Sequence, residues 1–410
     1  YRMVGPYLPT VMRSLAAPNV RIIFTDPRRF LQKSGRYDVI LVAMPEPTSG
    51  AANRFYTKEF FSTCAGRLNP GGVVGFRLQS SENYWPPLLS RRMGSIDRAA
   101  RSAFPYLIVL PGTTNVFLAS SGPLPSDAAV LEDRLNARRI HATLVSGPFL
   151  RYLYTNDRRA EIARTLKGGG GPENTDGRPI CYQYAAVMWL SKFFPAMAAT
   201  ELPTMSAVSG GGAAWILWIC ILAMFGLSRI SGMWRRALLV GVAGFAGMVL
   251  ETVLILHFQM KNGIIFQDIG MLLTGFMAGL AAGSVGFTLL ARSRDGSGRA
   301  FRWSGATILG GLVSLGLLVE RAADTGAMGG LVSVSVLLGA AGVLVAALFA
   351  YASLHRNSDQ SRLVSPLYAA DLLGGCAGSL LASLLLIPMA GLALSARYVA
   401  VLAVLALVLL

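Results

Sequence analysis

Residues 37–50 read YDVILVAMPEPTSG, and this stretch decides the fold of the N-terminal half of the chain. The four continuous apolar residues after Asp38 are typical of a buried parallel strand. Two prolines then enclose Glu46 in an acidic loop, and α/β folds place their ligands on the loop that follows such a strand. The pattern therefore predicts an α/β sheet with its candidate functional site at residues 43–47.

Strand and helix patterns alternate on both sides of this segment. The predicted strands cover residues 20–25, 37–42, 73–78, 106–110 and 115–119, and the predicted helices cover residues 26–34, 56–68 and 86–104. Asp26 is a predicted N-cap followed by Pro27, and the NPGG sequence at 69–72 predicts a tight turn. This order implies a parallel sheet that is covered on both faces and ends in an antiparallel hairpin.

The composition divides the 410 residues into two unlike halves. Residues 1–205 contain 25 Lys+Arg and 14 Asp+Glu, whereas residues 206–410 contain 12 and 7. We expect an α/β domain at 1–167, a linker and interfacial segment at 168–205, and a transmembrane domain at 206–410. The linker starts with a GGGG run, and its aromatic-rich part is too short to span a bilayer, so we expect that part to lie on the membrane surface.

The charge and cysteine patterns argue against several functions. The net charge is +16, but the basic residues are scattered among acidic ones without an aromatic-interleaved patch, which argues against nucleic-acid binding. The lipid bilayer, with its anionic headgroups, is the partner that this excess favours. The four cysteines form no CxxC motif and no Cys/His cluster, so we expect no metal site.

The start of the sequence lacks a feature of nucleotide-binding sheets. Such sheets open with a glycine-rich turn, because only glycine lets backbone amides approach a cofactor closely. No such turn precedes residue 20, and the chain begins at Tyr1 without a methionine. We therefore expect the N-terminal part of the fold to be missing, with the later half of the sheet present.

Several motifs in order resemble a known family. They are NVRIIFTDPRRFL, YDVILVAMPEP, RFYTKEFFSTCAGRLNPGGVVGF, QSSENY, FPYLIVLPGTTNVFLAS and NTDGRPICYQY. Together they resemble the spermidine synthase (polyamine aminopropyltransferase) family, and more closely its bacterial membrane-fused, multi-pass branch. The resemblance implies a Rossmann-like domain of the methyltransferase and spermidine synthase type. It also implies aminopropyl transfer from decarboxylated S-adenosylmethionine to putrescine.

The resemblance assigns roles to individual positions. Asp26 matches the aspartate that contacts the cofactor adenine, and Tyr56 matches a tyrosine after the catalytic loop; the alternatives are a plain N-cap and a packing residue. The family loop reads Asp-x-x-Asp-Pro with the first aspartate as the base, whereas this chain has Ala43 there and Glu46 at the second acidic position. A methyl group takes no proton, and the nearby Arg77 would repel a polyamine. We therefore expect a degenerate, non-catalytic site.

Seven candidate membrane spans follow in the C-terminal half. They cover residues 213–227, 237–258, 263–290, 303–319, 326–354, 364–388 and 394–410. Small residues recur at four-residue spacing in two spans, at Gly275, Gly279 and Gly283 and at Gly375, Ser379 and Ser383. Such stripes predict close packing within the bundle, with a homodimer interface as the alternative.

Three acidic residues lie inside or at the ends of these spans, namely Glu251, Asp268 and Asp371. Carboxylates are costly in lipid, so they usually face a polar interior or a partner. A structural pairing and an ion or substrate path are both open.

Basic residues are unevenly divided between the loops on the two sides of the membrane. Nine lie on the side of the first loop, against three on the other side: Arg229, Arg235, Arg236, Arg292, Arg294, Arg299, Arg302, Arg356 and Arg362, against Lys261, Arg321 and Arg397. Positive loops stay in the cytoplasm, so this bias places the first loop in the cytoplasm. One predicted span separates that loop from the α/β domain, so we expect the α/β domain to lie outside the cytoplasm at a bacterial inner membrane.

Three functions are compatible with these features. The changed loop and the expected topology favour a degenerate domain that acts as a binding or structural subunit of a membrane complex. The first alternative is an active polyamine aminopropyltransferase that uses decarboxylated S-adenosylmethionine. The second is a transporter with a soluble capture domain, for which the intramembrane acids are the evidence.

Overall fold

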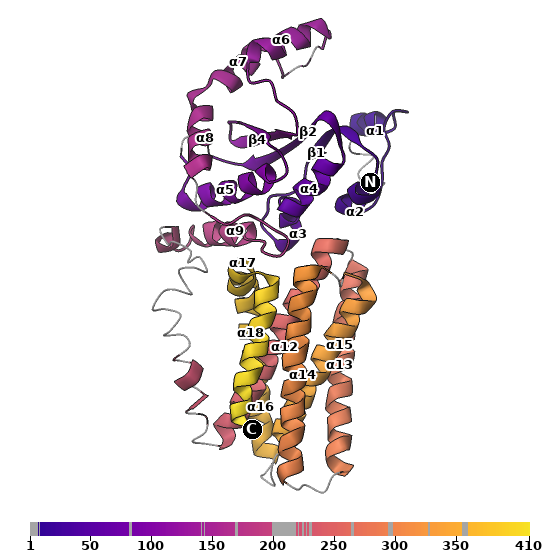
Figure 1. Ribbon diagram of the computed structural model, residues 1–410, viewed down its shortest axis with the longest axis vertical. Helices are drawn as coiled ribbons and strands as arrows, with labels where there is room; N and C mark the ends of the chain where they lie inside the picture. Colours follow the sequence, from indigo (N-terminus) through magenta and orange to yellow (C-terminus); the bar gives the residue numbers. More distant parts are fainter. Residues whose placement is uncertain are drawn as a thin grey trace.

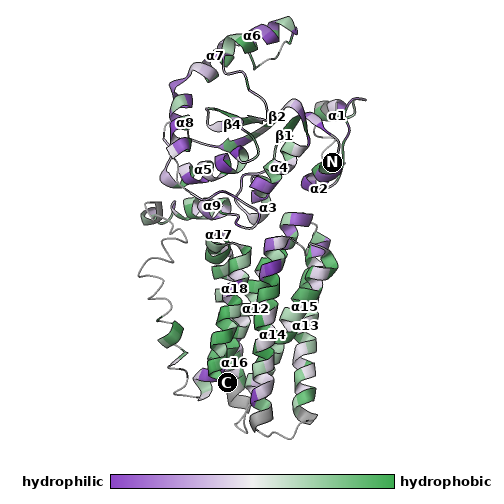
Figure 2. Cartoon of the chain, viewed as in Figure 1, coloured by the Kyte–Doolittle hydropathy of each residue, from purple (hydrophilic) through white to green (hydrophobic). Residues whose placement is uncertain are grey.

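The chain forms an α/β domain that is stacked on one end of a bundle of long helices (Figure 1). The computed structural model describes residues 7, 9–81, 84–140, 142, 144–168, 171–198, 219, 221–223, 225, 226, 228, 232–263, 266–293, 298–326, 329–354 and 360–410. Hydrophilic residues are concentrated in the α/β domain and hydrophobic ones in the bundle (Figure 2). The predicted architecture, an α/β domain followed by an all-α bundle, is confirmed.

The α/β domain contains a four-stranded sheet. Its strands are β1 (Tyr37–Val42), β2 (Leu68–Gln79), β3 (Tyr106–Leu110) and β4 (Thr114–Ser120), in the spatial order β1-β2-β4-β3. β1 and β2 are parallel, and β3 and β4 form the predicted antiparallel hairpin. The predicted turn at 69–72 lies within the bounds of β2 and not before it. Tyr37 pairs with Leu68 but Val39 pairs with Val73, so these residues loop out of the ladder, and Gly71 has a φ of +77°.

Two helices cover one face of this sheet, α4 (Lys58–Gly66) and α5 (Pro87–Arg101). The core between them contains Phe76 and Phe117, whose rings are stacked with centroids 4.7 Å apart. The remaining helices of the domain are α1 (Pro9–Leu15), α2 (Pro27–Lys33), α3 (Gly50–Asn53), α6 (Ala128–Ala137), α7 (Gly147–Thr155), α8 (Asp157–Gly168), α9 (Cys181–Leu190) and η2 (Pro195–Ala198).

Two details of the predicted sheet are wrong in the described part of the chain. The face opposite α4 and α5 is not covered, since Val39 and Leu41 are 57% and 76% exposed. Residues 20–25 do not form a strand, and Phe24 is exposed. A strand needs a neighbour for its backbone hydrogen bonds, and β1 is the edge strand of the described sheet, with no strand paired on its outer side.

In the described part of the chain, the bundle contains six helices that are long and apolar enough to cross a membrane. They are built from α12 (Gly232–Asn262), α13 (Phe266–Ser293), α14 (Gly298–Thr325), α15 (Leu331–Leu354), α16 (Gln360–Leu381) with the π-helix η3 (Ala382–Leu386) and α17 (Ile387–Ala390), and α18 (Leu392–Ala406) with η4 (Leu407–Leu409). Six of the seven predicted spans are therefore present. The other, at 213–227, lies outside the described residues except at scattered positions.

Glycines bring helix pairs of the bundle into backbone contact. A Cβ atom on Gly279 would overlap the carbonyl oxygen of Gly339, so α13 and α15 touch along the predicted stripe. The contact of α16 with α12 instead uses Gly374 and Gly378, the row beside the predicted one. The first stripe therefore packs within the chain, as predicted.

Candidate functional site

The loop after β1 carries one carboxylate, and that carboxylate already has partners. Ala43 is exposed at the end of the strand, where it offers only a methyl group. Glu46 Oε1 accepts a hydrogen bond of 2.6 Å from the backbone N–H of Gln79, and its Oε2 lies 3.2 Å from Nη2 of Arg92 on α5. Arg92 is buried and also donates to the carbonyl of Gln79 at 3.1 Å. Glu46 thus holds the loop to the end of β2 by a hydrogen bond and to α5 by an ion pair.

Tyr56 lies beneath this loop and fixes its backbone. The side chain is fully buried, and the phenol donates to the carbonyl of Met44 at 3.0 Å. Burial raises the pKa of the phenol, and the charge of Glu46 raises it further, so it stays a donor at neutral pH. Arg77 and Arg92 both act electrostatically on the phenol. Of these two cations, Arg92 is the one that pairs with the loop carboxylate.

Asp26 is placed at the junction between the α/β domain and the bundle. It is the N-cap of α2, where its carboxylate accepts from the backbone N–H groups of Arg28 and Arg29, both at 3.1 Å. The same carboxylate forms a buried ion pair with Arg54. It also fills the space beside Gly263 at the end of α12, whose φ of +86° favours glycine.

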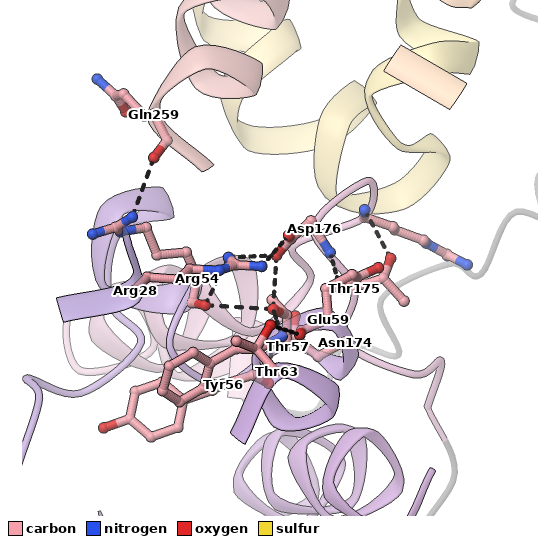
Figure 3. A network of polar contacts seen from close by, with 12 residues as sticks. Arg28, Arg54, Tyr56, Thr57, Glu59, Thr63, Asn174, Thr175, Asp176 and Gln259 are labelled. Atoms are coloured by element: carbon pink, nitrogen blue, oxygen red, sulfur yellow. Dashed lines mark hydrogen bonds and ion pairs between the residues drawn. The ribbon is translucent and has the colours of Figure 1, made fainter. Parts of the chain in front are cut away.

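A second carboxylate, Asp176, is the centre of the polar network shown in Figure 3. Its two carboxylate oxygens accept hydrogen bonds from the two terminal nitrogens of the buried Arg28. The carboxylate also accepts a hydrogen bond of 2.7 Å from the hydroxyl of Thr57. Its backbone N–H donates to Glu59 at 2.8 Å. Burial raises the pKa of Glu59, and the negative charge of Asp176 adds to this shift.

Asn174 extends the network towards the loop. Its side-chain amide pairs reciprocally with that of Asn53, at 3.2 and 3.1 Å, and donates to the carbonyl of Tyr56 at 2.8 Å. Arg28 also donates to the carbonyl of Arg54 at 3.1 Å, which links the two ion pairs. Sequence reasoning treated residues 174–178 (NTDGR) only as part of a family motif. The signal that could have revealed them is this run of polar residues directly before the apolar segment at 180–190.

The network continues into the ends of the bundle helices. Arg54 reaches the carbonyl of Gln259 on α12 at 3.5 Å. Arg178 donates from Nε to the carbonyl of Pro388 at 3.2 Å, and the backbone N–H of Leu392 donates to Gly177 at 2.8 Å. The α/β domain is therefore joined to the bundle by directional hydrogen bonds as well as by apolar packing.

Helix α9 lies between the α/β domain and the bundle and crosses the bundle end (Figure 1). Tyr182 donates to the carbonyl of Ser383 at 2.7 Å, and Gln183 donates to that of Leu384 at 3.0 Å. Both acceptors are in the π-helix η3, where the regular i to i−4 hydrogen-bond pattern is interrupted. The side chains of α9 thus supply donors to carbonyls at this irregular turn.

The acidic residues of the bundle are not brought together. Glu251 is buried in α12, whereas Asp371 of α16 lies against Gly244, which precedes Glu251 by seven residues on α12. Seven residues of an α-helix correspond to about 10 Å, so the two carboxylates lie at different levels of the bundle. Asp268 is in the first turn of α13, at the end of the bundle that contacts the α/β domain. Sequence reasoning missed an ion pair between α14 and α18, formed by Glu320 and Arg397. Among the described residues, no group of His, Cys, Asp and Glu could hold a metal ion.

Comparison with known proteins agrees with the architecture of the α/β domain. Residues 3–119 match the family model of the spermine/spermidine synthase domain. The chain is 33% identical over 110 residues to a polyamine aminopropyltransferase of Corynebacterium efficiens, covering 25% of this chain and 21% of that protein. It is 28% identical over 169 residues to that of Nitrosomonas europaea, covering 37% and 51%. It is 27% identical over 177 residues to polyamine aminopropyltransferase 2 of Pseudomonas aeruginosa, covering 40% and 48%.

The similarity covers only part of this chain and only part of each relative. The chain spans about half, or less, of the length of these curated relatives. The six long apolar helices lie beyond the matched family domain. The chain thus combines a spermidine synthase-like domain with candidate membrane helices.

Proposed function

We propose that this protein is a multi-pass membrane protein whose spermidine synthase-like domain does not transfer aminopropyl groups and serves as a structural or binding module of a membrane complex. The observation that carries the proposal is the loop after β1. Ala43 stands at the expected base, and the one nearby carboxylate, Glu46, is engaged by Arg92 and by the backbone N–H of Gln79.

The chemistry of aminopropyl transfer requires a base at this loop. An amine of putrescine attacks the carbon next to a sulfonium only after its ammonium group has lost a proton, and a positioned carboxylate normally takes that proton. The methyl group of Ala43 takes none. Glu46 would have to leave its ion pair with the buried Arg92, and an unpaired buried cation is costly. Arg77 and Arg92 also make the site unfavourable for a polyamine cation.

The position of Asp26 supports a structural role for the domain. The residue that the resemblance assigns to cofactor binding here caps α2, pairs with Arg54 and fills the space beside Gly263 of the bundle. A carboxylate with these three contacts contributes to docking of the domain on the bundle. We therefore assign no bound decarboxylated S-adenosylmethionine to this protein.

The orientation in the membrane is a further part of the proposal. The α/β domain contacts the end of the bundle where α12 and α17 end and α18 begins, and α12 and α14 begin at the opposite end with Arg235 and Arg302 (Figure 1). The positive-inside rule then places the α/β domain outside the cytoplasm of a bacterial inner membrane. Decarboxylated S-adenosylmethionine is a cytoplasmic nucleoside, so this orientation also separates the domain from that donor.

Cysteine labelling in intact cells tests the orientation. In a chain without its own cysteines, we expect an impermeant reagent to label Lys167→Cys, which is exposed on α8. We expect no labelling of Ser297→Cys, which lies between α13 and α14 in the sequence. Labelling at position 297 alone would reverse the orientation and restore access to cytoplasmic substrates.

Putrescine binding tests the proposed loss of function at the loop. We expect isothermal titration of the purified full chain in detergent to give no binding heat with putrescine. We expect the double variant Ala43→Asp/Arg77→Gln to gain affinity, because it restores a carboxylate and removes a cation. Micromolar binding by the wild-type chain would contradict the proposal and favour the active enzyme, which the family match keeps as the second candidate.

A further inference from the structure

The C-terminal end of α9 and the residues that follow it carry a group of exposed aromatic side chains. Trp189, Phe193 and Phe194 are 58%, 62% and 60% exposed, and the rings of Trp189 and Phe193 are in contact, with centroids 5.0 Å apart. Lys192 lies among them and is exposed as well. A contiguous group of large exposed apolar side chains is typical of a surface that contacts a partner. We call residues 189–194 the aromatic tip.

The preceding turns of α9 are buried and fix its position. Tyr184 and Val187 belong to the core of the α/β domain, and the hydrogen bonds of Tyr182 and Gln183 to η3 hold the start of the helix on the bundle. The C-terminal end of α9 extends sideways beyond α17 and α18 (Figure 1). The aromatic tip is therefore carried past the edge of the bundle by a helix that is packed against both parts of the chain.

The contact with η3 sets the level of α9 relative to the candidate membrane spans. The π-helix η3 is part of the span Val364–Ala390, and its Leu384 and Leu385 are 44% and 42% exposed. Exposed leucines on a membrane span face lipid, so the apolar surface of the bundle extends up to the turn that α9 contacts. Since α9 lies across the bundle end (Figure 1), the aromatic tip stays at the level where the apolar spans meet the polar α/β domain.

We propose that the aromatic tip inserts into the interface of the lipid bilayer beside the bundle, in the leaflet that faces the α/β domain. Tryptophan is enriched at this level, because its ring is apolar and its N–H group reaches water, and the phenylalanine rings enter the boundary of the acyl chains. Lys192 can extend its ammonium group to the lipid phosphates. The α/β domain is then attached to the membrane at a second place besides the bundle end. The proposal rests on a bundle that spans the bilayer, and it is independent of aminopropyl transfer.

Nitroxide spin labels on single cysteines test the proposal. The full chain without its own cysteines is labelled at Phe193→Cys or Phe194→Cys and placed in nanodiscs of phosphatidylcholine and phosphatidylglycerol. Collision rates of the label are measured with O₂, which concentrates in lipid, and with a water-soluble nickel chelate. Leu385→Cys reports on the lipid-facing surface of the bundle. Tyr152→Cys is the matched control, because Tyr152 is also 62% exposed but lies on α7, away from the bundle (Figure 1).

We expect the ratio of O₂ to nickel collisions at positions 193 and 194 to be several times that at position 152, and to approach the ratio at position 385. Ratios at 193 and 194 equal to that at 152, with a lipid-like ratio at 385, would overturn the proposal and leave the membrane bundle intact. A loss of both kinds of collision at the tip would show that protein covers it, from this chain, a second copy or another subunit, and would refute the lipid assignment. A water-like ratio at position 385 would refute the membrane-spanning bundle itself.

Discussion

The substitution Arg54→Met tests whether the Asp26 ion pair holds the α/β domain on the bundle. Both side chains are almost fully buried, at 3% and 11% exposure, and Arg54 also reaches the carbonyl of Gln259. Breaking a buried pair by removal of one partner costs about 3–5 kcal/mol. Asp26 keeps its hydrogen bonds from Arg28 and Arg29, so we expect the lower end, about 3 kcal/mol.

Native-state hydrogen exchange of the full chain in detergent measures this effect. A loss of about 3 kcal/mol corresponds to a roughly hundredfold faster exchange of amides that open when the domain separates from the bundle. We expect that acceleration at residues 26–34 and 259–263, with the centre of α12 unchanged. The control is Lys58→Met, which breaks an exposed ion pair with Glu173 and should cost at most about 1 kcal/mol. An effect of Arg54→Met no larger than that of the control would refute the reasoning.

Three further predictions concern the junction, the bundle and pH. Gly391→Ala should destabilise the junction by about 1–3 kcal/mol, because the φ of Gly391 is +93° and a Cβ atom there would lie 2.9 Å from the carbonyl oxygen of Gly177. The same hydrogen-exchange experiment measures this loss. The control is Gly177→Ala, since a Cβ atom on Gly177 would meet open space. Gly279→Ala should lower the thermal stability of the bundle in detergent by about 1–3 kcal/mol, since its Cβ meets the backbone of Gly339, whereas Gly286→Ala should be neutral. The raised pKa of Glu59 means that the native state binds its proton more tightly than the unfolded state. The stability of the wild type relative to Glu59→Gln should therefore fall as pH rises from the ordinary pKa of 4.5 to the raised value, and stay constant above it; a rise in urea unfolding experiments over that window would contradict the assignment.

The fold was predictable where local sequence determines it. The strand at residues 37–42 follows from a short apolar run, and the bundle helices follow from long apolar segments, so both were found from the sequence. Residues 20–25 carry the same kind of apolar pattern, yet they form no strand. Strand formation also depends on a partner that the local pattern does not specify, which is why that prediction was wrong.

The candidate site was predictable only in part, because its contacts join distant residues. Ala43 and Glu46 were identified by their position after a strand, but their roles stay predictions. Arg92, which pairs with Glu46, lies on a helix whose sequence indicates only packing. Arg28 and Asp176 are 148 residues apart, and a local pattern cannot specify which of many charged residues will meet. The use of Asp26 in the junction depends in turn on the folded bundle.

A direct assay of aminopropyl transfer tests the central claim. The purified full chain in nanodiscs is incubated with decarboxylated S-adenosylmethionine and putrescine, and spermidine is measured by mass spectrometry. The polyamine aminopropyltransferase of Nitrosomonas europaea, run in parallel, is the positive control. We predict that the wild-type chain forms no spermidine above the blank, because Ala43 provides no base. Spermidine that increases in proportion to the amount of wild-type protein, and that Ala43→Asp does not increase further, would contradict the account.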